Sequence, residues 1–119
     1  MKINEMKILG LNYFQFLFLF HIFIVTSILL FVGFSRNNTP NWFYNLLGIL
    51  GVIIILYHTY RLFTHGLRDY QWNYFHVLVV APILLYTAYM KTKTPNIIYD
   101  FYIIMGFGAF GINIYKLLK

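Results

Sequence analysis

The fold is decided by FHIFIVTSILLFVGFSRNNTPNWFYNLLGILGVIIILYHTYRL, residues 20–62, a stretch that the chain contains twice. It returns as FHVLVVAPILLYTAYMKTKTPNIIYDFYIIMGFGAFGINIYKL over residues 75–117. A shift of 55 residues aligns the two stretches without a gap, and 14 of the 43 aligned positions are identical. So biased a composition would give roughly three or four identities by chance. Each copy holds two apolar segments, so the sequence predicts a duplicated transmembrane hairpin.

The composition is that of a membrane protein. Of the 119 residues, 61% are hydrophobic and only 10% are charged. A soluble domain of this size cannot bury so much apolar surface, because small folds leave much of their surface in water. Crossing a hydrocarbon core of about 30 Å takes about 20 helical residues. Four windows approach or exceed that length, namely 13–34, 42–63, 72–89 and 97–118.

These windows define the predicted fold class. We expect an all-α membrane protein of four transmembrane helices, built as two helical hairpins in parallel repeat and forming a single transmembrane domain over residues 1–119. Repeat 1 covers about residues 13–63 and repeat 2 about residues 72–118. Because each repeat contains two crossings, both copies enter the membrane from the same side, and the repeat axis is expected to run along the membrane normal.

The distribution of lysine and arginine predicts the orientation. Basic residues concentrate on the cytoplasmic side of membrane proteins. Six lie at one predicted face and three at the other, so both termini are expected to be cytoplasmic. The inner set is Lys2, Lys7, Arg61, Arg68, Lys116 and Lys119, and the outer set is Arg36, Lys91 and Lys93.

Two helix starts follow from a repeated tripeptide. Both outer connections end in Thr-Pro-Asn, once at residues 39–41 and once at residues 94–96. Thr39 and Thr94 can cap the first free backbone N–H groups of the helices that follow. Pro40 and Pro95 would then occupy the first helical position, where proline loses no hydrogen bond. Small residues at repeat-equivalent positions, Gly51 and Gly106, are expected to let helix backbones approach closely.

Histidines inside the predicted spans are the strongest candidates for function. His21 and His76 are repeat partners, so they are expected at like depth and facing each other. His58 lies near the inner end of the second span, and its repeat partner is Asn113. Ionisable side chains in hydrocarbon cost roughly 2.5–3.5 kcal/mol on insertion scales, so each needs a partner or a function. The four side chains together predict one polar layer in the inner half of the membrane.

Three interpretations of this layer stay open. It is a hydrogen-bonded network that fixes helix register in a structural or assembly protein. It is a proton or ion pathway of a transport or permeation component, because imidazole exchanges protons near physiological pH. Or it is a cofactor site, in which His21 and His76 ligate haem b or a metal. Transport is the leading hypothesis, without a cofactor, and oligomerisation is expected because four helices leave little room for a pore.

A second polar position lies near the outer ends of the even-numbered spans. Asp100 is the only acid within the spans, and its repeat partner is Asn45. We expect Lys91 or Lys93 to neutralise the carboxylate from the adjoining loop, and tyrosines to donate hydrogen bonds to it. An acid at this place gathers cations in a pathway, or it is stabilised by the dipole of its own helix N-terminus.

Other function classes find no support in the sequence. There is no cysteine, so thiolate sites and disulfides are excluded. The net charge of +6 is scattered over every loop, which favours membrane topology over nucleic-acid binding. Paired carboxylates, an activated nucleophile and a phosphate-binding loop are all missing, so we do not expect an enzyme. The expected partners are the lipid bilayer and further copies of the chain.

The whole chain resembles a group of viral membrane proteins. The resemblance rests mainly on YHTYR (57–61), FHVLVVAPILLY (75–86) and MGFGAFG (105–111). These stretches are similar to those of uncharacterised small multi-pass membrane proteins of large DNA viruses that infect protists and algae. The resemblance implies a multi-pass membrane fold and carries no activity or site residues.

Overall fold

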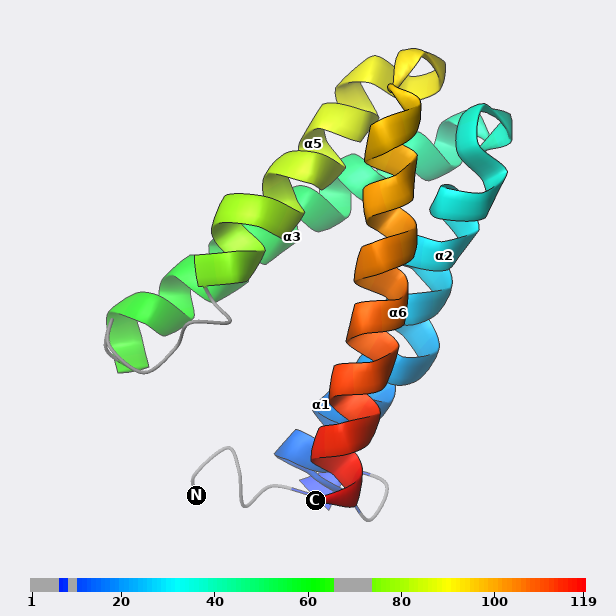
Figure 1. The fold of residues 1–119 in the computed structure, drawn as a ribbon. Helices are drawn as coiled ribbons and strands as arrows, with labels where there is room; N and C mark the ends of the chain where they lie inside the picture. The colour runs from blue at the N-terminus through cyan, green and yellow to red at the C-terminus, as the bar shows by residue number, and fades with distance from the viewer. Residues whose placement is uncertain (1–6, 9–10, 66–73) are drawn as a thin grey trace. The chain divides into compact units, whose positions relative to one another are not determined.

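The computed structural model describes residues 7–8, 11–65 and 74–119 and is helical almost throughout (Figure 1). Two short strands, β1 (Lys7–Ile8) and β2 (Leu11–Asn12), pair antiparallel at the start of the chain. The first long helix comprises α1 (Tyr13–Phe20), a π-helical turn η2 (His21–Val25) and α2 (Thr26–Ser35). The remaining elements are the 3₁₀ turn η3 (Arg36–Asn38), α3 (Asn41–His65), the π-helical turn η4 (His76–Val80), α5 (Ala81–Met90), the 3₁₀ turn η5 (Lys91–Lys93) and α6 (Asn96–Leu118).

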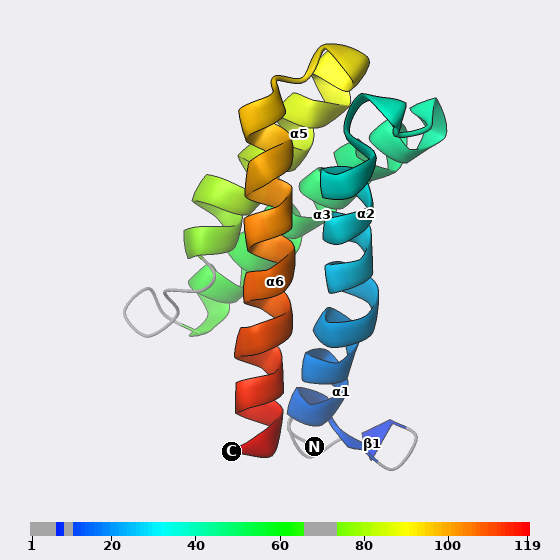
Figure 2. The ribbon, with the colours of Figure 1, turned by 45° about the vertical axis from the view of Figure 1, so that its right-hand side comes forward.

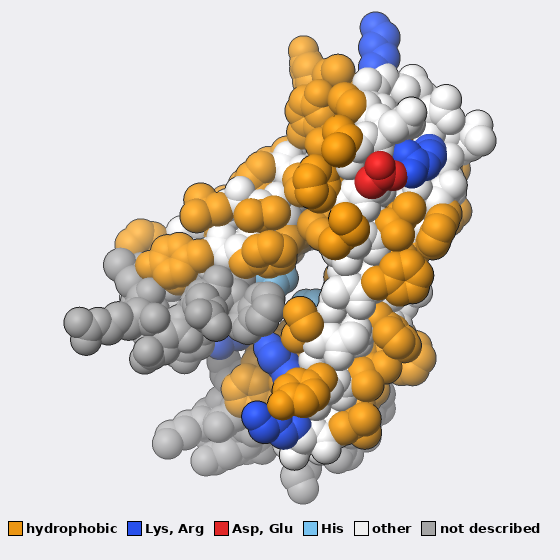
Figure 3. Space-filling model, in the orientation of Figure 1, with side chains coloured by type: hydrophobic (Ala, Val, Ile, Leu, Met, Phe, Trp, Pro, Cys, Tyr) orange, Lys and Arg blue, Asp and Glu red, His pale blue; other side chains and the backbone are white. Residues whose placement is uncertain are grey.

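Membrane-spanning character is evident in three of these helices. The helices Tyr13–Asn38, Asn41–Thr64 and Asn96–Leu118 are long and apolar enough to cross a membrane. Their bounds agree with three predicted windows to within a few residues. The fourth predicted span, 72–89, is not among them, and Trp72 lies outside the described residues, as do the topology residues Lys2 and Arg68. Figure 3 shows hydrophobic side chains along the visible faces of α5 and of α6, where a soluble protein would carry charge.

The chain forms two compact units, which are treated separately below. Unit 1 consists of Met1–Arg36 and Tyr99–Lys119, and unit 2 of Asn37–Ile98. Unit 1 therefore pairs α1–α2 with α6, and unit 2 pairs α3 with η4–α5; within each unit the helices run side by side in both ribbon views (Figures 1 and 2). Each unit takes one helix from each predicted repeat. The sequence predicted hairpins made of two helices of the same repeat, so the helix partners differ from that expectation.

Close contacts at small residues explain these partners. In unit 1, a Cβ added at Gly106 would lie 2.6 Å from Leu30 Cδ2. In unit 2, a Cβ added at Gly51 would lie 2.9 Å from Leu85 Cγ. Since a leucine side chain occupies the space that a larger residue would need, the glycine lets the two helices approach. Gly51 and Gly106, the two glycines named for packing, both lie at such close contacts.

Several structural features recur at a spacing of 55 residues. The π-helical turns begin at His21 and His76, and the 3₁₀ turns begin at Arg36 and Lys91. Arg36 and Lys91 both have a φ of 51°, a left-handed value that glycine adopts more readily than other residues. Buried residues recur at the same spacing as Thr26/Ala81, Leu29/Leu84, Val32/Thr87, Thr39/Thr94, Tyr44/Tyr99 and Leu47/Tyr102.

The π-helical turns have different local causes in the two units. In η4 the carbonyl of His76 accepts the N–H of Ala81, which places Pro82 in the first turn of α5. The wider π-helical turn before Pro82 accommodates the proline ring and its missing N–H within a continuous helix. In η2 no proline is present, and the carbonyl of His21 accepts both the N–H and the hydroxyl of Thr26, the latter at 2.9 Å.

The helix starts agree with the Thr-Pro-Asn prediction to within one residue. Helix α3 begins at Asn41 and α6 at Asn96, one position after the prolines rather than on them. The carbonyl of Pro40 already accepts the N–H groups of Phe43 and Tyr44, at 3.0 and 3.3 Å. The hydroxyl of Thr94 donates to the carbonyl of Lys91 at 2.7 Å and so stabilises the turn before α6. Capping of α3 by Thr39 stays a prediction.

Candidate functional site

Two of the four residues of the predicted polar layer, His58 and His76, meet in unit 2. The imidazole rings of His58 on α3 and His76 at the start of η4 are stacked, with centroids 4.3 Å apart and planes inclined by 16°. Both side chains are partly buried. Aromatic neighbours lie edge-on to them: Tyr57 against His58 at 5.0 Å and Phe75 against His76 at 5.9 Å. The stacked pair joins the two helices of unit 2 through groups that can exchange protons.

Stacking limits what this pair can bind. The ring nitrogens direct their lone pairs in the plane of the imidazole, so two face-to-face rings do not aim lone pairs at a common point between them. In this arrangement His58 and His76 do not chelate one ion. Within residues 11–65 and 74–119, His, Cys, Asp and Glu side chains form no group of three or more that could hold a metal.

The other two residues of the predicted layer belong to unit 1 and bond to their own helices. His21 Nδ1 lies 2.8 Å from the carbonyl oxygen of Leu17, so Nδ1 donates and Nε2 is the acceptor nitrogen of the ring. Asn113 Nδ2 donates to the carbonyl of Ala109 at 2.7 Å. Because His21 and Asn113 belong to a different unit from His58 and His76, the single four-residue layer stays a prediction, as does a His21–His76 pair.

Asp100 has a different partner from the one predicted. The carboxylate forms an ion pair with Arg36, at the end of α2, rather than with Lys91 or Lys93. The Arg36 guanidinium also lies 5.9 Å from the ring centroid of Tyr99. Figure 3 shows the acidic group against a basic one near the upper end of α6. Lys91 and Lys93 were predicted as partners because they lie close to Asp100 along the chain. The pairing of α2 with α6 in unit 1 brings Arg36 to the N-terminal turn of α6.

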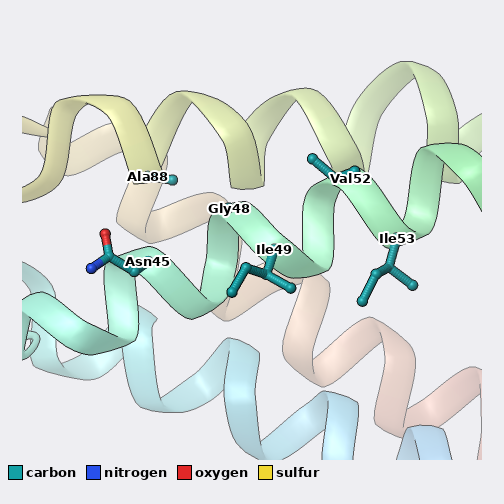
Figure 4. A pocket seen from close by; sticks show the side chains of 6 residues that line it. All are labelled: Asn45, Gly48, Ile49, Val52, Ile53 and Ala88. Atoms are coloured by element: carbon teal, nitrogen blue, oxygen red, sulfur yellow. The ribbon is translucent and has the colours of Figure 1, made fainter.

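Asn45 lines a groove in unit 2 (Figure 4). It is the repeat partner of Asp100 but carries no charge, so unit 2 has no equivalent of the Arg36–Asp100 ion pair. The groove combines five residues of α3 with one of α5. They are Asn45, Gly48, Ile49, Val52, Ile53 and Ala88. Asn45 was a candidate ligand, ion or proton pathway residue as the repeat partner of Asp100, and the groove was not predicted from the sequence.

Known proteins add nothing to this description. Comparison with protein-family models, with curated proteins and with solved structures finds no match.

Sequence reasoning placed the start of the first helix at residue 13, where α1 begins, but missed the capping box that precedes it. Asn12 and Gln15 form a capping box, in which Asn12 Oδ1 accepts the N–H of Gln15 at 2.8 Å and Gln15 Oε1 accepts the N–H of Asn12 at 3.2 Å. The signal was available, since Asn followed three residues later by Gln before an apolar run is typical of a helix start. The ion pair had a weaker signal, the placement of Arg36 and Asp100 at the same predicted membrane face.

Proposed function

We propose that the protein spans the membrane four times and arose by duplication of a two-helix segment, with both copies inserted in the same direction. The 14 identities in 43 aligned positions support this. So do the recurrence of π-helical turns at His21 and His76 and of the left-handed residues Arg36 and Lys91. Independent origin would not place these irregularities at equal spacing, because each is uncommon in helical proteins.

We further propose that this membrane protein is a proton-linked transport or permeation component. The observation that carries the proposal is the stacked His58–His76 pair between two apolar helices. Intramembrane ionisable groups are expensive, and they mark proton or ion pathways in many transporters. An imidazole can bind a proton and release it near physiological pH, and in the stacked arrangement each ring keeps its in-plane nitrogens available to neighbouring polar groups or water.

Electrostatics supports one transferable proton at this pair. Two imidazolium charges at about the 4.3 Å centroid spacing would repel by about 4 kcal/mol at an effective dielectric constant of about 20. The stacked geometry is therefore that of a neutral or singly protonated pair. Both histidines are therefore needed for the proposed function.

Proton flux into liposomes tests the proposal. The protein is reconstituted in vesicles containing a pH-sensitive dye, and a pH gradient is applied with valinomycin and potassium to clamp the potential. We expect flux above that of empty vesicles, and we expect His58→Asn to reduce it at least tenfold. This change is mild for packing, because asparagine already occupies the equivalent position 113 in unit 1.

A matched control comes from the repeat partner of His76. His21 bonds to its own helix through Leu17, so His21→Gln is expected to leave proton flux within about twofold of the unchanged protein. Circular dichroism of each variant establishes that helix content is retained. Equal flux in the unchanged protein and in folded His58→Asn would refute the proposal, as would flux no greater than that of empty vesicles.

A haem or metal site is the second candidate, and one observation favours it. A metal-bound histidine usually donates its other ring N–H to a carbonyl or carboxylate, which orients the ring. His21 Nδ1 donates to the carbonyl of Leu17 in this manner. His21 and His76, the pair expected from the repeat, would be the two ligands of a haem b.

The absorption spectrum of the purified protein separates the two candidates. If His58 and His76 carry protons, we expect no haem absorption and no stoichiometric metal. A haem band that is lost in both His21→Leu and His76→Leu, while His58→Asn retains it, would overturn the proton proposal in favour of the cofactor. Metal analysis of the same sample extends the measurement to colourless ions.

A further inference from the structure

The groove in unit 2 is apolar along most of its length. Its volume is about 460 Å³, and five of its six lining residues have apolar side chains or are glycine. The lining residues Ile49, Val52 and Ile53 are 59%, 49% and 52% exposed. Asn45 is the one polar lining residue and lies about one turn from the start of α3 at Asn41. The groove is thus polar at one end and apolar beyond it (Figure 4).

Comparison with unit 1 explains why the groove exists. The repeat partner of Gly48 is Ile103, whose side chain packs against Gly33, the partner of Ala88. The partner of Val52 is Phe107, whose ring contacts Phe34 with centroids 6.5 Å apart. Unit 2 therefore has two smaller side chains on α3 where unit 1 has isoleucine and phenylalanine. The missing side-chain volume leaves an open groove, since a packed helix pair otherwise has few voids.

Two lysines follow the groove residue Ala88 closely along the chain. Helix α5 continues from Ala88 into η5, whose first and last residues are Lys91 and Lys93. In the sequence of residues 37–98 the sole acid is Asp69, 24 positions after Asn45 along the chain. In unit 1 the residue equivalent to Asn45 is Asp100, which forms an ion pair with Arg36. In unit 2 the residue equivalent to Arg36 is the basic Lys91, whereas the residue equivalent to Asp100 is the neutral Asn45.

We propose that this groove binds an anionic phospholipid. An acyl chain lies along Gly48, Val52 and Ile53, and the phosphate faces the lysines of η5. The amide of Asn45 donates a hydrogen bond to a phosphate or ester oxygen at the junction of head and tail. Clusters of basic groups near the membrane surface attract anionic lipids, and amide donors add charge-assisted hydrogen bonds.

A lipid fits the charge better than a second copy of the chain does. A helix of another copy would fill the apolar part of the groove, but it would bring a carboxylate to the lysines only from Glu5, Asp69 or Asp100. Asp100 is engaged by Arg36, and the other two lie in or next to segments on the opposite predicted face. An anionic headgroup supplies the negative charge and the apolar chain in one molecule.

The first test measures headgroup selectivity. The full chain is purified in a neutral detergent, and its thermal unfolding is followed while phosphatidylglycerol or phosphatidylcholine of the same acyl chains is added. We expect phosphatidylglycerol to bind more tightly and to raise the unfolding temperature further. Asn45→Asp, which restores the carboxylate of unit 1, is expected to weaken phosphatidylglycerol binding roughly fivefold or more and to leave phosphatidylcholine binding unchanged. Equal binding of the two lipids would overturn the proposal.

The second test fills the groove by copying unit 1. Gly48→Ile alone would be crowded, because a Cβ at this position lies 3.1 Å from Ala88 Cβ. The double change Gly48→Ile with Ala88→Gly reproduces the Ile103–Gly33 contact and removes the clash. We expect native mass spectrometry to show loss of the retained phospholipid from this variant, while helix content is unchanged.

Leu78→Phe serves as the matched control for the second test. Leu78 is 69% exposed and is not among the residues that line the groove, so this change enlarges a side chain without filling it. The proposal would be overturned if the Gly48→Ile, Ala88→Gly variant retained as much phospholipid as the Leu78→Phe control. The same conclusion follows if filling the groove abolishes a dimer and leaves the bound lipid unchanged, because the groove would then be an interface between copies.

Discussion

Gly33→Ala is expected to lower the free energy of unfolding by about 2 kcal/mol, because this position has no room for a methyl group. A Cβ at Gly33 would lie 2.6 Å from Ile103 Cγ1, 3.0 Å from the backbone nitrogen of Ile103 and 3.2 Å from the carbonyl oxygen of Tyr99. Two of these atoms belong to the backbone of α6, so the clash is relieved only by moving the helix. Reversible unfolding in mixed micelles, followed by circular dichroism, measures the change.

Other glycines of unit 1 provide the controls. Gly108→Ala and Gly111→Ala place a Cβ where no heavy atom lies within 4 Å, so they are expected to be neutral or slightly stabilising. Gly106→Ala would meet mainly the side chain of Leu30, and we expect Leu30→Ala to relieve that clash. Ile103→Ala is not expected to rescue Gly33→Ala, because the backbone contacts remain. Equal stability of Gly33→Ala and Gly108→Ala would show that α2 and α6 are not in contact at this point.

An engineered disulfide between α3 and α5 is expected to form almost completely within unit 2. The chain contains no cysteine, so a pair can be introduced without any background. For unit 2 the pair is Gly48→Cys with Ala88→Cys, where a Cβ at Gly48 lies 3.1 Å from Ala88 Cβ. Disulfides join Cβ atoms about 3.5–4.5 Å apart, so a small outward shift suffices.

The readout is protection from maleimide after mild oxidation, together with the loss of two hydrogens in the intact mass. The control is Ile49→Cys with Tyr89→Cys. Each of these residues follows a member of the Gly48–Ala88 pair in the sequence, and their side chains are 59% and 85% exposed. We expect the control to stay labelled. Full labelling of the Gly48–Ala88 pair, or disulfides only between chains, would contradict the pairing of α3 with α5.

The spans and their starts were largely predictable because their causes are local. Apolar windows of about 20 residues form helices wherever water is excluded, since each backbone group must then be bonded within the segment. The helix starts at Asn41 and Asn96 follow from proline, whose fixed φ and missing N–H act within one turn. The π-helical turns were not predicted, although Pro82 gives a local reason for one of them.

The candidate site was predictable only in part. The repeat drew attention to His21, His58, His76 and Asn113, and the sequence indicated His21 and His76 as the pair that would meet. The structure brings His58 and His76 together, because α3 pairs with η4 and α5, while a His21–His76 pair stays a prediction. The partner of Asp100 was wrong for the same reason. Nearness along the chain favoured the lysines, whereas Arg36 reaches Asp100 from 64 residues away.

The sequence by itself determined the apolar character, the helices and the equivalence of positions 55 residues apart, because hydrophobicity, proline and internal similarity are properties of the chain alone. Only the tertiary structure decided which helices pair. That choice depends on the fit of one side chain against one small residue, as where Ile103 meets Gly33 and where Gly48 faces Ala88. The same fit placed the histidine rings against each other and left a groove in one unit where the other is filled.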